Sequence, residues 1–358
     1  MTWLQKECYL CALMKDVYPF NPEHDLALAH GAHNYTAPPF ARQLRHDLRL
    51  LPSWVAPVGS YIAVPNDAPL DEDFQWLIDH HLDVTPIPTS QIAGMGPCRI
   101  HPWGWDAALR YQLMQVGVSR DFLPTDEQLE SIRRLSHRRT SIAIHLALGE
   151  DFSPCPVELN TQEDVVSFMN QNPGCYLKMP WSGSGKGIYR VIDPQDDHHV
   201  PRWIEGALRR QGSLLCELGL DKVQDFAIEC NCRDGITSLM GYSVFESDFH
   251  SQFGTGLVAP MEELHQLLLK QYPDLDARVG EVLKAMDSIV APRYNGPLGI
   301  DMMLFRNTKG IIDLNPCVEI NLRMTMGMIT SAMGSRHCLC GRFSLVFDNN
   351  RYSFSLSR

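Results

Sequence analysis

Long hydrophobic runs are absent from this sequence of 358 residues. A membrane-spanning helix needs roughly 18 consecutive apolar residues, and no segment reaches that length. The first twenty residues are mildly apolar, but charged side chains interrupt them, and they lack the basic start and small-residue cleavage site of a secretion signal. We therefore expect no membrane partner and a cytoplasmic location.

Positive charge is also scarce. Lys and Arg number 31 against 42 Asp and Glu, which gives a formal net charge of -11. A protein that binds a phosphate backbone normally has the opposite balance or a concentrated basic stripe. Nucleic acid is therefore not an expected partner.

The cysteines show no disulfide framework and no zinc-site spacing. Their number, eleven, is odd, and they are spread over the whole chain. Cys8 and Cys11 form one CxxC pair, but no second pair or histidine pair follows at the distance that a structural zinc site requires. We expect reduced thiols, most of them buried as small apolar side chains.

What the sequence does contain is enough apolar material, 44% of the residues, for a large packed interior. At roughly 100 to 200 residues per domain, the length predicts two or three lobes. The first part alternates strand-like and helix-like segments and predicts a small α/β lobe with a parallel sheet. Its segments are a strand over 61–65, a helix over 71–81, a strand over 84–88 and helices over 105–117 and 125–137, the last capped by Thr125.

The pattern becomes rich in strands after residue 125, where we place the domain boundary. An Asp234-Gly235 turn predicts a hairpin, Pro273 divides a long amphipathic helical region over 261–289, and Asn349-Asn350 predicts a closing hairpin. The predicted strands cover 175–178, 188–192, 213–217, 225–233, 236–245, 298–305, 310–323, 343–347 and 352–356.

A glycine-rich turn with two lysines is the first candidate for chemistry. Lys178 lies on a predicted strand, and Lys186 lies in the turn that follows it, within Ser182–Gly187. Small residues let backbone N–H groups approach phosphate oxygens, and two ammonium groups can offset the charge of a triphosphate. The turn is not a Walker A motif, because Gly187 rather than Ser or Thr follows Lys186. Taken alone, a glycine-rich loop of this kind is more often a plain hairpin.

An acidic pair of strands is the second candidate. Asp301 opens one predicted strand, and Glu319, Asn321 and Arg323 lie two residues apart on the return strand. Residues two apart on a strand share a face, so the three side chains project together. Two carboxylates and an amide oxygen are hard ligands of the kind that Mg²⁺ prefers, although alternation of this type also occurs on a solvated sheet face.

Together and in this order, the two features resemble the ATP-grasp superfamily over about residues 136 to 335. The resemblance also includes the strand 214–217, which ends in Glu217. It implies an α/β and α+β protein: an N-terminal α/β lobe like a preATP-grasp domain (1–125), then an ATP-grasp domain of two subdomains with antiparallel sheets (126–358). The first of these, 126–212, would be lid-like and carry the glycine-rich loop, and the second, 213–358, would bind metal.

The resemblance further implies ATP and Mg²⁺ and a role for each matching residue. Asp301, Glu319 and Asn321 would bind the metal, and Glu217 with Leu220 would hold the adenosine part. The phosphates would be bound by Lys178, Ser182, Gly183, Ser184, Gly185, Lys186 and Gly187.

The metal-binding strand has an alternative. Asp313 and Asn315 imitate the same pattern, and Asp313 lies 12 residues after Asp301, against 18 for Glu319. The usual separation in the family is nearer the shorter one. We favour Glu319, because nine residues separate Asp301 from Gly310 and nine separate Gly310 from Glu319, so a symmetric hairpin would place the two acids opposite each other.

In addition to Lys186, two arginines are candidates for a catalytic role. In ATP-grasp ligases an arginine near the metal residues steadies the transferring phosphoryl group, and a planar guanidinium suits that task. Arg323 shares the face of the predicted ligands. Arg293 is the second candidate, and its alternative is an ordinary surface position in a loop.

The resemblance implies an ATP- and Mg²⁺-dependent ligase that joins a carboxylate to an amine or thiol through an acyl-phosphate. The substrates would be small molecules or peptides, and a homodimer is the default for the class. An ATP-grasp phosphotransferase and a non-catalytic nucleotide-binding protein are the alternatives. The segment Asn21–Asp25 is expected to cap a helix through Asn21 or Asp25, with substrate binding as its alternative.

Overall fold

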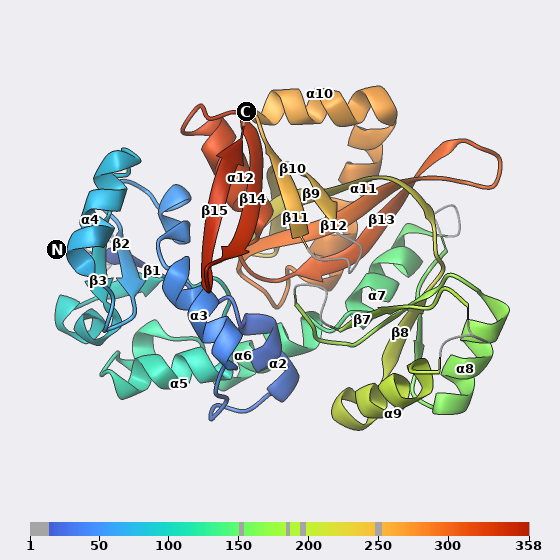
Figure 1. Ribbon diagram of the computed structural model, residues 1–358, viewed down its shortest axis with the longest axis horizontal. Helices are drawn as coiled ribbons and strands as arrows, with labels where there is room; N and C mark the ends of the chain where they lie inside the picture. Colours follow the sequence, from blue (N-terminus) through green and yellow to red (C-terminus); the bar gives the residue numbers. More distant parts are fainter. Residues whose placement is uncertain (1–13, 150–153, 184–186, 194–197, 248–252, 358) are drawn as a thin grey trace. The chain divides into compact units, whose positions relative to one another are not determined.

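The computed structural model describes residues 14–149, 154–183, 187–193, 198–247 and 253–357. The chain divides into two compact units (Figure 1). The first comprises Met1–Glu130 with Val346–Ser353, and the second comprises Ser131–Leu345 with Phe354–Arg358. Within the described ranges, no helix combines the length and apolar character needed to cross a membrane.

The first unit contains a four-stranded sheet in the order β3-β2-β1-β4, with every neighbouring pair parallel. The predicted α/β lobe with a parallel sheet is therefore confirmed. Apolar side chains such as Val17, Ile92 and Leu113 form its core. Its strands are β1 (Lys15–Pro19), β2 (Tyr61–Val64), β3 (Thr85–Pro88) and β4 (Cys98–Ile100). Its helices are α2 (His24–His30), α3 (Pro39–Asp47), η1 (Leu51–Trp54), α4 (Leu70–Asp79), η2 (Thr89–Met95), α5 (Ala107–Gln115) and η3 (Arg120–Phe122), and α6 (Asp126–Leu135) continues into the second unit.

Two predicted helix caps have different outcomes. Thr125 caps α6 as predicted: its hydroxyl accepts from the Gln128 backbone N–H at 3.2 Å, and the Gln128 side chain accepts from the Thr125 N–H at 2.8 Å. The cap predicted at Asn21 or Asp25 is wrong, because α2 begins after Glu23 and that position makes no side-chain cap hydrogen bond. Asn21 instead donates to the carbonyl oxygen of Gly104 at 2.8 Å and to Asp106 at 3.2 Å, so it joins the ends of β1 and β4.

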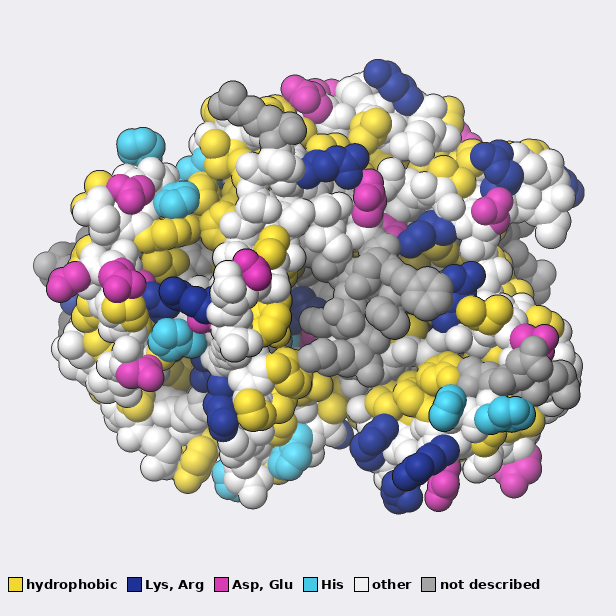
Figure 2. Space-filling model, in the orientation of Figure 1, with side chains coloured by type: hydrophobic (Ala, Val, Ile, Leu, Met, Phe, Trp, Pro, Cys, Tyr) yellow, Lys and Arg dark blue, Asp and Glu magenta, His cyan; other side chains and the backbone are white. Residues whose placement is uncertain are grey.

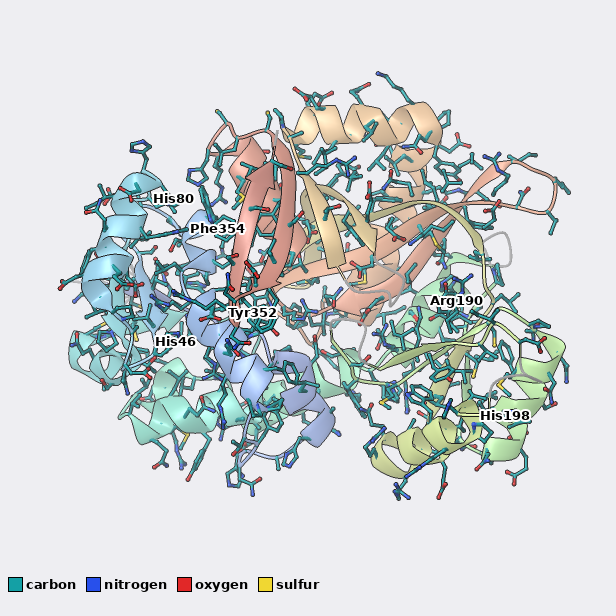
Figure 3. All side chains as sticks on the ribbon, viewed as in Figure 1. His46, His80, Arg190, His198, Tyr352 and Phe354 are labelled. Atoms are coloured by element: carbon teal, nitrogen blue, oxygen red, sulfur yellow. The ribbon has the colours of Figure 1, made fainter. Side chains whose placement is uncertain are left out.

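The second unit is built on a seven-stranded sheet in the order β13-β12-β9-β10-β11-β14-β15. Asp234 and Gly235 both have positive φ in the turn between β9 and β10, as the hairpin prediction requires. Phe354 of β15, labelled in Figure 3, stacks on Phe343 of β14, with ring centroids 5.3 Å apart. The strands are β9 (Asp221–Arg233), β10 (Ile236–Ser247), β11 (Phe253–Val258), β12 (Gly296–Arg306), β13 (Ile312–Asn321), β14 (Gly341–Asp348) and β15 (Arg351–Ser357). The helices that contact this sheet are α7 (Arg139–Leu148), α10 (Met261–Gln271), α11 (Leu275–Ile289) and α12 (Met326–Ser335).

A smaller sheet in the order β5-β8-β6-β7 lies in the same unit, drawn in green in Figure 1. Its core joins the sheet to two helices through fully buried side chains such as Val165, Leu177 and Ile204. The elements are β5 (Val157–Leu159), α8 (Gln162–Gln171), β6 (Tyr176–Lys178), β7 (Ile188–Arg190), α9 (Val200–Gln211) and β8 (Leu214–Glu217). Arginines gather on the outer side of α9 in Figure 2, where Arg202, Arg209 and Arg210 line an open groove. None of the predicted site residues that the structure describes lines that groove.

Candidate functional site

Strands β12 and β13 bring the predicted metal ligands together on one face. Asp301 pairs with Glu319, and Gly299 pairs with Asn321. Because directly paired residues project to the same side of an antiparallel sheet, both acids and the amide share that side. The Asn321 side-chain amide donates to Asp301 Oδ2 at 3.2 Å, and Arg323 Nη2 donates to Asn321 Oδ1 at 2.9 Å. The pairing that we expected from a symmetric hairpin is confirmed, while the metal role stays a prediction.

The alternative pair occupies a different part of the same hairpin. An irregularity in the register follows Asp301, after which Asn315 pairs with Met303 and Asp313 pairs with Phe305. The Asp313 carboxylate accepts a hydrogen bond from the backbone N–H of Leu314 at 2.9 Å. Neither residue of the alternative pair therefore faces an acidic partner across the strands.

Electrostatics at this face favour a cation. Burial and the neighbouring carboxylates of Glu319 and Glu229 raise the pKa of Asp301 well above the usual carboxyl range, against the opposing effects of Arg323 and the Asn321 hydrogen bond. Within the described residues, no group of three or more His, Cys, Asp or Glu side chains could hold a metal ion. The predicted ligands Asp301, Glu319 and Asn321 supply two carboxylates and one amide oxygen. They fit Mg²⁺ only if oxygens from a bound ligand complete the coordination.

The strand lysine and the strand glutamate predicted for nucleotide binding contact each other. Lys178 on β6 and Glu217 on β8 form an ion pair with Nζ and Oε2 2.5 Å apart, and the Lys178 side chain is only 7% exposed. They lie diagonally across the two strands, because Lys178 pairs with Leu215 and Tyr176 pairs with Glu217. Leu220 lies partly exposed in the short connection after β8.

The buried thiol of Cys317 lies near both the Lys178–Glu217 pair and the Asp301–Glu319 pair. Cys317 of β13 is completely buried, and burial raises the pKa of its thiol. The carboxylates near enough to raise that pKa further are those of Asp301, Glu217 and Glu319, and the Lys178 ammonium opposes them. Side chains predicted for phosphate, adenosine and metal therefore all lie close enough to Cys317 to influence its thiol. Sequence reasoning had no signal for Cys317, since an isolated cysteine on a strand is ordinary core material.

The glycine-rich loop is described at its two ends, and Ser184, Gly185 and Lys186 lie outside the described residues. The backbone N–H of Met179 donates to the Gly187 carbonyl at 2.8 Å and closes the loop. A Cβ atom at Gly187 would lie 2.3 Å from the Cβ of Ser182, so position 187 requires glycine. Ser182 is buried, and Gly183 follows it on the loop.

Arg138 is the residue that sequence reasoning missed. Its guanidinium donates to the Met179 carbonyl at 3.1 Å through Nε and to the Ser182 hydroxyl at 3.2 Å through Nη2. Arg138 Nη1 and Glu319 Oε2 lie 2.8 Å apart and form an ion pair, although the angles between them are not those of a hydrogen bond. One buried arginine thus joins the glycine-rich loop to the predicted metal-binding strand. It precedes α7 in a run of basic residues that carries no motif.

The second arginine candidate, Arg293, lies exposed in the turn between α11 and β12. Its backbone N–H donates to the Val290 carbonyl at 3.0 Å, as in an ordinary turn. Arg323, by contrast, is hydrogen-bonded to Asn321. The contacts therefore favour Arg323 over Arg293 for the predicted catalytic role.

His137 beside Arg138 makes the stability of this region depend on pH. Burial, followed by the charges of Arg139, Arg133 and Arg138, lowers the pKa of His137 from 6.5 to about 3. The unfolded chain binds this proton below pH 6.5 but the folded protein does not, so the contribution to stability is full above pH 6.5 and is lost as the pH falls toward 3. We expect a loss on the order of 1 kcal/mol per pH unit in that window.

Denaturant unfolding of the wild type and of His137→Gln between pH 4 and 7 tests this expectation. The variant should be less stable at pH 7 and show a shallower pH dependence, whereas substitution of the exposed His30 by Gln should leave the slope as it is. Equal slopes for the wild type and His137→Gln would contradict the assignment.

No protein-family model matches the sequence, and no curated protein matches it. Solved structures do match it, and what they share with this chain is the fold, in agreement with the fold that the ATP-grasp resemblance predicted. The pyruvate carboxylase of Rhizobium etli matches with a TM-score of 0.54 at 12% identity, over 89% of this chain and 27% of that one. The biotin carboxylase of Campylobacter jejuni, in complex with β,γ-ATP, matches with a TM-score of 0.51 at 12% identity, over 93% of this chain and 75% of that one. The biotin carboxylase domain of the 2-oxoglutarate carboxylase of Hydrogenobacter thermophilus matches with a TM-score of 0.51 at 13% identity, over 92% of this chain and 74% of that one. At these identities the match shows a shared fold.

Proposed function

We propose that this protein is an ATP- and Mg²⁺-dependent ligase that joins a carboxylate to an amine or thiol through an acyl-phosphate. The observation that carries the proposal is the convergence at Arg138 of the glycine-rich loop, which follows Lys178, and of Glu319, which faces Asp301. The biotin carboxylase of Campylobacter jejuni, which has the same fold, was solved in a complex with β,γ-ATP. The shared fold and the convergence together support a nucleotide site in this chain.

Each side chain has a defined task in this proposal. Asp301, Glu319 and Asn321 would hold Mg²⁺, which when bound with ATP draws charge from the phosphoryl group that is transferred. Lys178, Arg138 and Lys186 would neutralise phosphate oxygens, and Glu217 would orient the nucleoside. Arg323 would steady the transferring phosphoryl group, so that positioning and electrostatics supply the rate enhancement without a covalent nucleophile.

The proposal is tested by measuring ADP release from Mg·ATP against pools of carboxylates, with and without pools of amines and thiols. A ligase yields ADP, phosphate and an amide or thioester, and release should require both substrates. Formation of a stable phosphoester with one acceptor alone would indicate a phosphotransferase. Tight Mg·ATP binding with no release under any pool would contradict catalysis.

Lys178→Met separates the phosphate role of this lysine from its structural role. Its removal leaves the mostly buried Glu217 carboxylate without its ion-pair partner, so the free energy of unfolding should fall by about 2–4 kcal/mol. The double variant Lys178→Met/Glu217→Gln should recover part of that stability while ADP release stays at background. Recovery of ADP release along with stability would mean that Lys178 serves the fold and does not bind phosphate.

A further inference from the structure

A third carboxylate lies on the face that carries the predicted metal ligands, and the proposed mechanism does not use it. Gly299 of β12 pairs with Asn321 of β13 on one side and with Glu229 of β9 on the other. The side chains of Glu229 and Asn321 therefore project to the same side of three adjacent strands, with a glycine between them. Glu229 is 2% exposed, which is unusual for a carboxylate unless it has a specific role.

Both oxygens of the Glu229 carboxylate are held by hydroxyl groups. Ser243 of β10 donates to Oε1 at 2.7 Å, and Thr325 donates to Oε2 at 2.7 Å. Since each oxygen already accepts from the protein, this carboxylate is poorly suited to bind a metal ion. The arrangement instead fixes its position.

Two glycines make room for this carboxylate. A Cβ atom at Gly327 would lie 1.9 Å from Glu229 Oε1, and one at Gly299 would lie 3.0 Å from Oε2 and 2.7 Å from the Thr325 side chain. Neither glycine has a positive φ, so backbone conformation does not explain its presence. The space that they leave open serves the Glu229 carboxylate and its hydroxyl partner.

Thr325 links this carboxylate to Arg323. It is the N-cap residue of α12, where its hydroxyl oxygen accepts from the Met328 N–H at 3.1 Å while its O–H donates to Glu229. Arg323 lies two residues earlier and donates to the Met324 carbonyl at 3.1 Å and to Asn321. The Arg323 charge is also close enough to oppose the rise that burial causes in the pKa of Glu229.

We propose that Glu229 is a positioning residue for Arg323: its carboxylate, fixed by Ser243 and Thr325, holds the Arg323 segment and guanidinium beside Asn321. This inference rests on the proposed function, in which Arg323 faces the transferring phosphoryl group. The Glu229 carboxylate accepts from Ser243 and Thr325 and from none of the predicted metal or phosphate ligands, so its effect on the transferring phosphoryl group would be exerted through Arg323.

Glu229→Gln tests the inference, with Glu246→Gln as the matched control. Glu246 lies on the neighbouring strand β10, where it is exposed and ion-paired with Arg342. We expect Glu229→Gln to bind the Mg²⁺ complex of β,γ-imido-ATP within about twofold of wild type, because the hydrogen bonds of Glu229 go to Ser243 and Thr325 and not to the predicted metal or phosphate ligands. Its affinity for Mg·ADP with fluoroaluminate, a mimic of the transferring phosphoryl group, should fall at least about tenfold, and kcat for ADP release should fall about 10²-fold.

Ser243→Ala provides a second variant that keeps the carboxylate and removes one of its two hydroxyl donors. It should show the same pattern with a smaller loss, and it carries the test if Glu229→Gln does not fold. A lowered melting temperature with wild-type fluoroaluminate affinity and kcat would overturn the inference and leave the proposed function intact. An equal loss of affinity for both nucleotide complexes would overturn it as well, because Glu229 would then act on the metal site. A wild-type protein that binds no Mg·ATP would overturn the proposed function itself.

Discussion

Glu319→Gln is expected to reduce Mg²⁺-dependent ADP release by about 10³-fold or more. The substitution keeps the size of the side chain and removes one of the two charges that face each other across β12 and β13. Because Asp301 would then be the only carboxylate among the predicted metal ligands, the affinity for Mg²⁺ should fall. The nucleotide would lose the cation that neutralises its phosphates. Titration of ADP release with Mg²⁺, together with calorimetric binding of Mg·ATP, measures both effects.

Asp313→Asn is the matched control, since it makes the same kind of change on the same strand. Asp313 pairs with Phe305 and accepts from a neighbouring backbone N–H, so its loss should leave the Mg²⁺ dependence of ADP release near that of wild type. An active Glu319→Gln variant beside an inactive Asp313→Asn variant would assign the metal to the other part of the hairpin.

Arg138→Gln should have an effect of similar size, by a different route. Arg138 is 6% exposed and contacts Met179, Ser182 and Glu319, so its removal detaches the glycine-rich loop from the metal-binding strand. We expect a fall of about 10³-fold in ADP release, as for other arginines that face a transferring phosphoryl group. We also expect a loss of about 3–5 kcal/mol in the free energy of unfolding, because a buried ion pair is broken on one side.

Arg138→Lys separates the effect of the positive charge at position 138 from the effect of the planar guanidinium. A lysine keeps the positive charge near Glu319 but cannot reach both Met179 and Ser182 with one planar group. Stability should be partly restored while activity stays well below wild type, as measured by denaturant unfolding and by ADP release. Wild-type activity in Arg138→Lys would mean that charge alone matters and that the loop contacts are incidental.

Much of the fold followed from local patterns in the sequence. The turn at Asp234-Gly235 and the break at Pro273 lie where hairpin β9–β10 and the gap between α10 and α11 are found. These signals are local, because a positive φ or a missing N–H acts at its own position. Strands β1 and β4 were not predicted, since five and three residues are too few to show a clear alternation.

The site was less predictable, because most of it depends on contacts between distant segments. Counting residues around Gly310 predicted that Asp301 faces Glu319, but in the structure this pairing also depends on the irregularity in register between Asp301 and Met303, for which the sequence carried no signal. The role of Arg138 has no such signal, since its partners lie about 40 residues and about 180 residues further along the chain. Asn21 was assigned to a helix cap for the same reason, because its partner Gly104 is brought close only by the parallel sheet.

The pair formed by Arg138 and Glu319 provides one of the two predicted metal-binding acids with a counter-ion from the chain itself. Glu319 faces Asp301, and its negative charge is one cause of the raised pKa of Asp301. In the proposed function, Glu319 would hold Mg²⁺ and the Arg138 guanidinium would be available to phosphate oxygens of the nucleotide. The affinity for the metal should therefore depend on the presence of the nucleotide, and the affinity for the nucleotide on the presence of the metal.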